Sequence, residues 1–249
     1  MNHIPRKNNA RGGKAAEKFS HVLASKGTQT KSIFEIRKFR HVDRNIVANY
    51  LSQNNVRKLH IGCGSHILPG WLNSDYFTRS SDILHLDATR PFPFNDDEFD
   101  YIFSEHMIEH ISYSQGFLML TECFRVLKRN GKIRISTPDL SFLVDLHKEN
   151  KSNVEENYIK WATNSFIKDA PYDDAAFVIN NFVRNWGHTF IYDKRTLRSS
   201  LERAGFTSIT ERKLAQSEHD ALSNLENEER QPCGFLRLET FTLEATKMA

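Results

Sequence analysis

The sequence predicts a single α/β domain, a mostly parallel sheet with helices on both of its faces. Two observations lead to this fold class. Short apolar runs that end in turn residues alternate with longer segments of helical periodicity, which is typical of strand–helix–strand units. The 249 residues are 39% hydrophobic, which is enough for one sizeable core and too little for two independent enzymatic domains.

The first elements are predicted to be a helix and four short strands. Apolar side chains recur at helical spacing over residues 33–50, which indicates an amphipathic helix packed on the domain. The apolar run Lys58–Ile61 ends at Gly62-Cys63-Gly64, as expected of a buried strand that enters a tight turn. Three more strands are expected at residues 71–76, 83–86 and 99–104.

The second half of the chain continues this alternation with one interruption. A helix is predicted over residues 115–127, with a basic last turn and a glycine stop at residues 128–131, and a strand follows at 132–136. Residues 141–185 are predicted to form several short helical pieces, which interrupt the alternation of strands and helices. A further helix at 196–204 and strands at 206–211 and 237–245 complete the domain.

An N-terminal arm, residues 1–40, carries the positive charge of the chain. It holds ten Lys and Arg residues against two Glu, which leaves 24 basic and 29 acidic residues in the domain proper, residues 41–249. Its many Asn, Gly, Ser and Ala residues predict a solvated, partly disordered tail. Binding of nucleic acid or of an anionic membrane surface through this arm stays open as an alternative.

Composition also excludes several classes of protein. No apolar run approaches the ~18 residues of a membrane helix, and no hydrophobic leader follows the first basic residues. Cys63, Cys123 and Cys233 lie far apart and form no CxxC pair, so neither a disulfide framework nor a zinc site is expected. We expect a soluble, cytoplasmic protein; the oligomeric state is left open.

Candidate binding residues follow the predicted strands, because ligands of open α/β sheets bind beyond the carboxyl ends of the strands. The Gly62-Cys63-Gly64 turn lets the backbone approach a ligand and offers N–H groups to an anionic group. Asp75, after the second strand, suits the hydroxyls of a ribose, and Asp87, after the third, suits an adenine amino group. Each of these features also fits an ordinary turn or cap.

Several motifs occur in a fixed order along residues 57–249. They are Leu59-His60-Ile61-Gly62-Cys63-Gly64, Leu68-Pro69-Gly70-Trp71-Leu72-Asn73-Ser74-Asp75, Leu86-Asp87-Ala88-Thr89, Glu98-Phe99-Asp100-Tyr101-Ile102, Glu109-His110 and Ala204-Gly205-Phe206. This order resembles class I methyltransferases that use S-adenosylmethionine (SAM), in particular the predicted bacterial group of methyltransferase type 11. The resemblance implies a Rossmann-like sheet of seven strands, and it leaves the methyl acceptor unnamed.

The same resemblance implies roles for individual residues. Gly62, Cys63 and Gly64 would lie against the methionine part of SAM, and Asp75, with Tyr76 beside it, would take the ribose. The remaining cofactor-binding residues implied by the resemblance are Asp87 and Ala88 at the adenine and Ser104, Glu105 and His106 near the sulfonium. His60 departs from the family, where many relatives have an acidic residue.

Histidines are the candidates for a general base. SAM supplies the reactive carbon, so the protein mainly aligns the two reactants, and a base is needed only for a hydroxyl or ammonium acceptor. His188 and His106 are the predicted catalytic residues, and either also fits a structural hydrogen-bonded histidine. His106 and His110 are four apart and suit one face of a helix, but with no carboxylate-rich cluster beside them no metal site is predicted. Residues 141–190 are expected to form a helical lid over the acceptor.

The leading hypothesis is a SAM-dependent methyltransferase acting on an oxygen or nitrogen of a small-molecule or sugar-containing acceptor. An RNA or protein methyltransferase that docks through the basic arm is one alternative. A SAM-binding scaffold without catalysis is another. A dehydrogenase is disfavoured, because the sequence after Gly64 lacks the GxGxxG pattern of a dinucleotide site.

Overall fold

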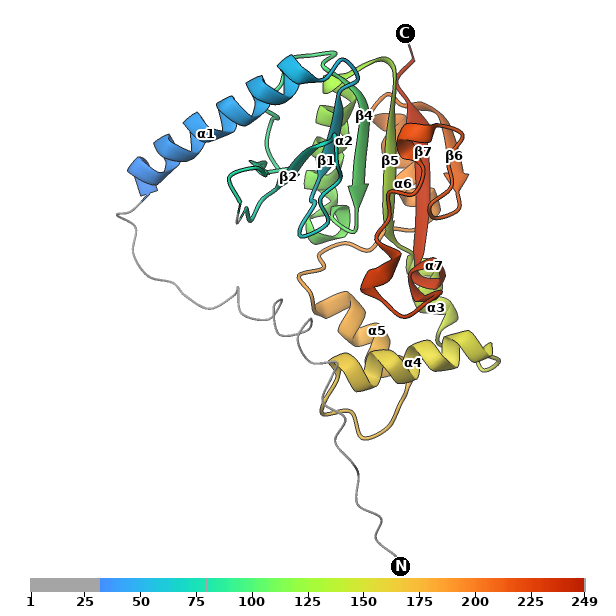
Figure 1. The fold of residues 1–249 in the computed structure, drawn as a ribbon. Helices are drawn as coiled ribbons and strands as arrows, with labels where there is room; N and C mark the ends of the chain where they lie inside the picture. Colours follow the sequence, from blue (N-terminus) through green and yellow to red (C-terminus); the bar gives the residue numbers. More distant parts are fainter. Residues whose placement is uncertain (1–31, 79, 249) are drawn as a thin grey trace, which may run out of the picture.

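The computed structural model describes residues 32–78 and 80–248, and its centre is a seven-stranded sheet in the order β3-β2-β1-β4-β5-β7-β6 (Figure 1). The strands are β1 (Lys58–Ile61), β2 (Leu72–Asp75), β3 (Leu84–His85), β4 (Phe99–Glu105), β5 (Leu127–Pro138), β6 (Thr207–Arg212) and β7 (Thr240–Thr246). Strand β7 runs antiparallel to β5 and β6, and the other neighbours are parallel. The predicted fold class, a mostly parallel Rossmann-like sheet, is confirmed.

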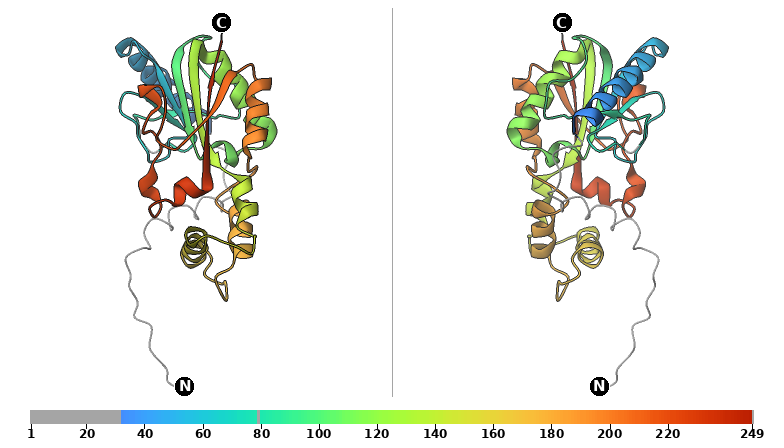
Figure 2. Two further views of the ribbon diagram at one scale, coloured as in Figure 1. Left: turned by 90° about the vertical axis from the view of Figure 1, so that its right-hand side faces the viewer. Right: turned by 90° about the vertical axis from the view of Figure 1, so that its left-hand side faces the viewer.

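Helices flank this sheet and continue beyond its lower end. They are α1 (Ser32–Gln53), α2 (Tyr113–Val126), α3 (Leu140–Asp145), α4 (Asn153–Phe166), α5 (Ala175–Arg184), α6 (Lys194–Arg203) and α7 (Phe235–Glu239), with 3-10 turns η2 (Ile108–His110), η3 (Asp220–Leu222) and η4 (Glu228–Arg230). Figure 2 shows α2 and α6 on one side of the sheet and α1 on the other. The α2 and α6 side buries the main core, which includes Leu59, Ile102 and Ile133 from the three central strands.

Two predicted boundaries are wrong, each because tertiary contacts outweigh the local pattern. Residues 128–131 do not extend a helix: α2 ends at Val126, and the backbone of this stretch pairs with the end of the chain through Asn130 N–H to Lys247 O (2.7 Å) and Lys247 N–H to Gly131 O (3.0 Å). The predicted strand at 237–245 begins only at Thr240. The residues before it form α7, which buries Phe235 and Leu236.

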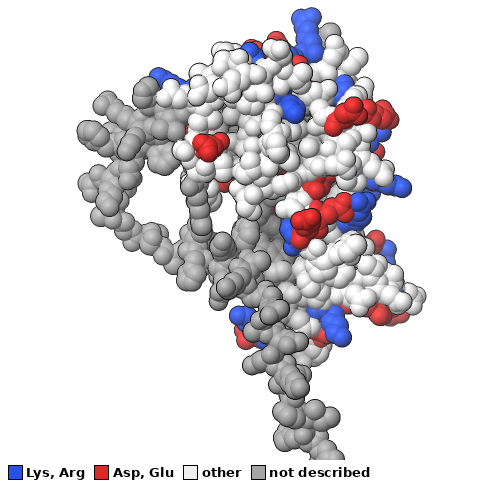
Figure 3. Space-filling view, in the orientation of Figure 1, with Lys and Arg blue, Asp and Glu red and all other residues white. Residues whose placement is uncertain are grey.

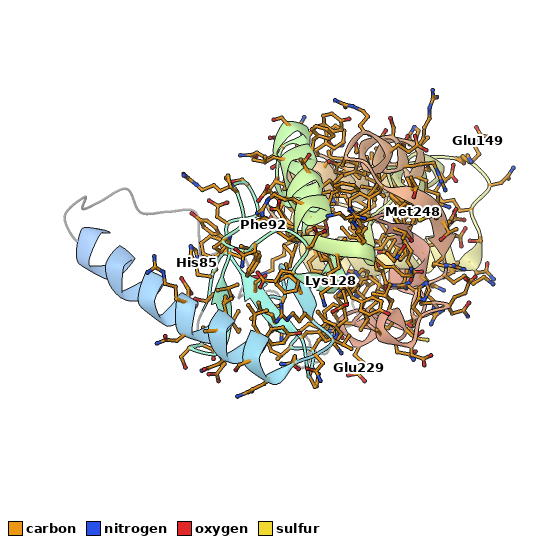
Figure 4. All side chains as sticks on the ribbon, turned by 90° about the horizontal axis from the view of Figure 1, so that it is seen from above. His85, Phe92, Lys128, Glu149, Glu229 and Met248 are labelled. Carbon is orange, nitrogen blue, oxygen red and sulfur yellow. The ribbon has the colours of Figure 1, made fainter. Side chains whose placement is uncertain are left out.

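Helix α1 begins at Ser32, so the predicted arm of residues 1–40 ends in a helix, and its first 31 residues lie outside the described part. The helix reaches the sheet at its β3 edge, where the Asp43 carboxylate accepts the backbone N–H of His85 (3.2 Å). Figure 4 shows His85 between α1 and the sheet. The contact confirms that the amphipathic segment packs on the domain.

The face opposite α2 and α6 has an unusual covering over β1 and β4. A loop without a helix connects β1 to β2, and its Leu68 and Trp71 pack with Phe103 of β4. Leu222 and Leu225, from the segment after β6, complete this small core. A loop segment therefore takes the place of a first crossover helix.

Helices α3, α4 and α5 form a small core of their own with α7, built around Phe142, Tyr158 and Phe182. In Figure 1 they lie beyond the lower end of the sheet, the end to which the β4 arrow points. This helical segment corresponds to the insertion predicted over residues 141–190. Its role as a lid stays a prediction.

The described surface mixes both charges. Figure 3 shows basic and acidic side chains interspersed on the visible face, over the part that the structure describes. Within residues 32–78 and 80–248, no helix combines the length and the apolar character that crossing a bilayer requires.

Candidate functional site

The Gly62-Cys63-Gly64 turn lies where β1 ends, and neighbouring strand β2 holds it in place. The N–H groups of Gly62 and Cys63 both donate to Ser74 O at 2.9 Å. Gly62 has a φ of 74°, and a Cβ there would lie 2.3 Å from Met107 Cγ, so only glycine fits under that side chain. Gly64 has a φ of 53°, and a Cβ there would meet no described atom within 4 Å. A side chain therefore has no room at Gly62, whereas the space beside Gly64 is open among the described residues.

The Cys63 side chain is buried in this turn. Burial, with the nearby Asp75 charge, raises the pKa of the Cys63 thiol to about 12. A thiol that stays protonated is a poor nucleophile, which agrees with a packing role.

Asp75 lies at the end of β2 and faces the glycine turn. One carboxylate oxygen accepts the Gly64 N–H (2.9 Å) and the other accepts the Phe77 N–H (2.7 Å). A carboxylate offers about four lone-pair positions, so two remain for further donors such as ribose hydroxyls. Tyr76, next in the chain, is 53% exposed and packs edge-on against Phe77. The first two predicted cofactor features are thus joined by a hydrogen bond.

Asp87 makes the contacts of a turn residue. Its carboxylate accepts from the Thr89 N–H (3.0 Å), the Thr89 hydroxyl (2.6 Å) and Arg90 Nε (3.0 Å). Burial raises the pKa of the Asp87 carboxyl, but these hydrogen bonds outweigh it and hold the pKa below its ordinary value. Ala88 beside it is buried. The adenine role of the pair stays a prediction.

The end of β4 contributes Ser104 and Glu105. The Ser104 hydroxyl is buried and has no hydrogen-bond partner among the described residues. Glu105 accepts the Asn227 N–H with both oxygens (3.2 Å) and lies 3.4 Å from Arg230 Nη2 and 3.6 Å from His66 Nδ1. Glu105 therefore connects the sheet to the segment before α7.

A cavity of about 480 Å³ lies beside this connection. Its lining consists of His66, which follows the glycine turn, and of residues between β6 and α7: Ala215, Asn224, Glu226, Asn227, Glu228 and Glu229. Through His66 the cavity reaches the loop that follows the glycine turn.

His106 and His110 do not share a helix face, contrary to the spacing argument. His106 has a φ of 47° and precedes the single 3-10 turn η2, which carries Glu109 and His110. Glu109 lies between the two rings: its Oε1 is 3.5 Å from His106 Nδ1 and 4.0 Å from His110 Nε2. The His106 Nε2 lies 2.7 Å from the Thr240 hydroxyl, so both of its ring nitrogens have neighbours. Burial, with Arg230 nearby, lowers the pKa of His106 well below its ordinary value.

Glu109 is fully buried on η2. Its Oε2 accepts from the Thr137 hydroxyl (3.1 Å), whereas Oε1 has no hydrogen-bond partner among the described residues. Burial raises the pKa of the Glu109 carboxyl to about 8.

His188 meets His110 at the junction of the sheet and the helical segment, with ring centroids 5.0 Å apart. Its Nδ1 lies 2.6 Å from Phe182 O, and a carbonyl only accepts, so Nδ1 carries the proton and Nε2 keeps its lone pair. Burial, followed by the His110 charge, lowers the pKa of His188 to about 4, which keeps the ring neutral at pH 7.

Comparison with known proteins identifies the central part of the chain. Residues 59–135, from β1 into β5, match the family model described as a methyltransferase domain. The match covers less than half of the chain, and it indicates a methyltransferase domain that uses SAM in this part of the protein. No curated protein matches the chain in sequence.

Solved structures of other methyltransferases are similar at low identity. A SAM-dependent methyltransferase of Archaeoglobus fulgidus is 17% identical, covering 84% of this chain and 94% of that one, with a TM-score of 0.46. A SAM-dependent methyltransferase of Thermotoga maritima is 16% identical over 86% and 96%, with a TM-score of 0.44. The phosphoethanolamine N-methyltransferase 2 of Haemonchus contortus, in complex with SAM, is 14% identical over 84% and 53%, also at 0.44.

The described residues around the glycine turn are compatible with SAM. Gly64 leaves open space, Asp75 keeps free acceptor positions, and the unpartnered Ser104 hydroxyl lies on the adjacent strand. Parallel pairing sets these residues side by side, because Ile61 of β1 is in register with both Ser74 and Ser104.

Sequence reasoning missed several residues of this site. No local motif predicts the following contacts: Met107 with Gly62, Thr240 with His106, and Asn227 and Arg230 with Glu105. Up to 134 residues separate these pairs, so only the folded chain brings them together.

Proposed function

We propose that this methyltransferase moves the methyl group to an oxygen or nitrogen of a small-molecule or sugar-containing acceptor. One observation carries the proposal: the neutral His188 imidazole donates from Nδ1 to Phe182 O, and its Nε2 has no hydrogen-bond partner among the described residues at the junction of the sheet and the helical segment. A free imidazole nitrogen suits an acceptor that must lose a proton, such as a hydroxyl or an ammonium group.

The helical segment supports the same assignment. Helix α5 ends at Arg184, and the turn Trp186-Gly187-His188 returns the chain to η2, where Thr189 and Phe190 N–H donate to Glu109 O (2.7 and 3.1 Å). Such a segment beyond the carboxyl ends of the strands excludes water from a bound acceptor. We therefore assign α3 to α5 as the lid.

The residues contribute alignment and proton transfer. SAM, when bound, supplies a methyl carbon on a positively charged sulfur. The chain orients the acceptor so that its O–CH₃ or N–CH₃ bond forms as the S–CH₃ bond breaks, with the S–C electron pair left on sulfur. His188 Nε2 receives the acceptor proton. His106 is the second candidate and is less accessible, because both of its ring nitrogens already have neighbours.

The test uses methyl-labelled SAM with fractionated small molecules and glycans. His188→Ala is expected to keep SAM affinity within about twofold and to lower turnover by about 10²- to 10⁴-fold, the range for a general base. His147→Ala, at an exposed histidine of the same chain, is the control. A His188→Ala protein that loses SAM binding, or that works at the parent rate, contradicts the role.

A further inference from the structure

Three side chains converge where η2 meets the turn after α5. Glu109, His110 and His188 each offer one ligand atom, and these atoms lie within 4.8 Å of one another. His188 lies 78 residues after His110, so no local sequence spacing predicts that the three side chains meet. Two imidazoles and one carboxylate make up a donor set that first-row divalent cations prefer.

The structure assigns to Glu109, His110 and His188 a binding site for a divalent cation of the Zn²⁺ type, with one coordination position open toward the acceptor. The sequence argument predicted no metal because it found no carboxylate-rich cluster with His106 and His110. The fold instead groups Glu109 and His110 with His188, which takes the place of His106 as the second imidazole.

An unpartnered atom marks the centre of the cluster. The Glu109 side chain is 0% exposed, yet its Oε1 accepts no hydrogen bond among the described residues. An unpaired polar atom so deeply buried destabilises the fold unless a further group satisfies it. A cation in reach of this oxygen and of the two rings would satisfy it and balance the carboxylate charge.

The other atoms of the same side chains are held as metal ligands usually are. A ligating histidine commonly donates its second N–H to a carbonyl, and His188 Nδ1 donates to Phe182 O at 2.6 Å. Ligating carboxylates are themselves hydrogen-bonded, and Glu109 Oε2 accepts from the Thr137 hydroxyl at 3.1 Å. His188 Nδ1 and Glu109 Oε2 are thus held by hydrogen bonds, and His188 Nε2 and Glu109 Oε1 are left to bind the cation.

The required adjustment is small. Ligand atoms about 2.0–2.1 Å from a tetrahedral Zn²⁺ are roughly 3.3 Å apart, so a separation of up to 4.8 Å must shrink by about 1.5 Å. The His110 side chain is 35% exposed and can make this movement. Three protein ligands leave the fourth tetrahedral position for a water or an acceptor oxygen.

This inference rests on the proposed function for its role and specifies how the acceptor is activated. Nε2 of His188 can hold a proton or a cation, not both, so the base role proposed above applies to the metal-free protein. With the cation bound, His188 would act as a ligand instead, the cation would make an acceptor hydroxyl more acidic as a Lewis acid, and the released proton would pass to water. The oxygen would then be positioned for the methyl group by the same three residues.

The test measures cation binding directly and needs no acceptor. The full chain, freed of metal with a chelator, is titrated with Zn²⁺ by calorimetry, and Co²⁺ absorption reports the coordination geometry. We expect one equivalent bound through two imidazoles and a carboxylate. Glu109→Gln and His110→Ala are each expected to weaken binding by at least about 100-fold, because even outer-shell partners are worth about 10- to 100-fold.

His147→Ala serves as the matched control and is expected to bind Zn²⁺ like the parent. Melting temperature and SAM affinity report whether each variant folds. If the variant at the buried position, Glu109→Gln, does not fold, His110→Ala still tests the site. Absence of a stoichiometric site in the parent, or parent-like binding by a folded variant, overturns the assignment. If the protein binds the cation but methylates no hydroxyl or amine acceptor, the result contradicts the proposed function and leaves the cation site supported.

Discussion

His60 gives the methyltransferase a pH-dependent stability that can be worked out from the structure. The ring is 1% exposed, and its Nδ1 lies 3.0 Å from Asn73 Oδ1. The Asn73 amide NH₂ donates to Leu68 O and Trp71 O, so its oxygen faces the ring and His60 is neutral with the proton on Nδ1. Burial lowers the pKa of His60 from 6.5 to about 4.

A folded-state pKa below the unfolded one means that the unfolded chain binds more protons between the two values. The stabilisation from neutral His60 is therefore complete above pH 6.5 and is lost as the pH falls toward 4. At about 1.36 kcal/mol per pKa unit the full loss is roughly 3 kcal/mol, with about 2 kcal/mol of it gone by pH 5.

Urea unfolding at pH 7 and pH 5 measures this loss. His60→Asn keeps a donor near the Nδ1 position and removes the titrating ring. Between pH 7 and pH 5 the free energy of unfolding of this variant should therefore decrease by about 2 kcal/mol less than that of the parent. His147→Asn, at an exposed position, should follow the parent. Equal losses in the parent and in His60→Asn would refute the reasoning.

Three further substitutions test the site and its support. Asp75→Ala should weaken SAM binding by about 1.5–3 kcal/mol, measured by calorimetry, with unchanged affinity contradicting the ribose role. Arg134→Met should cost about 3–5 kcal/mol in urea unfolding, because it leaves the buried Glu226 carboxylate, 2.7 Å from Arg134 Nε, without its charge partner; a loss below about 1 kcal/mol would refute this. Gly62→Ala should lower the melting temperature and SAM affinity, and adding Met107→Ala should recover part of the stability; no recovery would show that backbone conformation alone matters.

Local pattern predicted much of the fold. Strand β1 is found at the predicted bounds Lys58–Ile61, and α1, α2 and α6 lie within a few residues of their predictions. The helices follow from periodicity because each packs one face toward the sheet, whereas β1 follows from a short apolar run that ends at a glycine turn. The errors fall where pairing partners come from far along the chain, as at Asn130 with Lys247.

The sequence by itself determined the glycine turn and Asp75, which we expect to form the cofactor end of the site. Gly62, Gly64 and Asp75 sit at the ends of two adjacent parallel strands, and a turn that follows a strand stays beside that strand in any arrangement of the rest. Only the tertiary structure decided the cluster that we propose as the acceptor end. His188 joins Glu109 and His110 because the helical segment packs its own core and returns to η2. Arg230 reaches Glu105 because the chain after β6 crosses the face on which no helix connects β1 to β2. Contacts of this kind depend on the packing of whole segments, which no local spacing encodes.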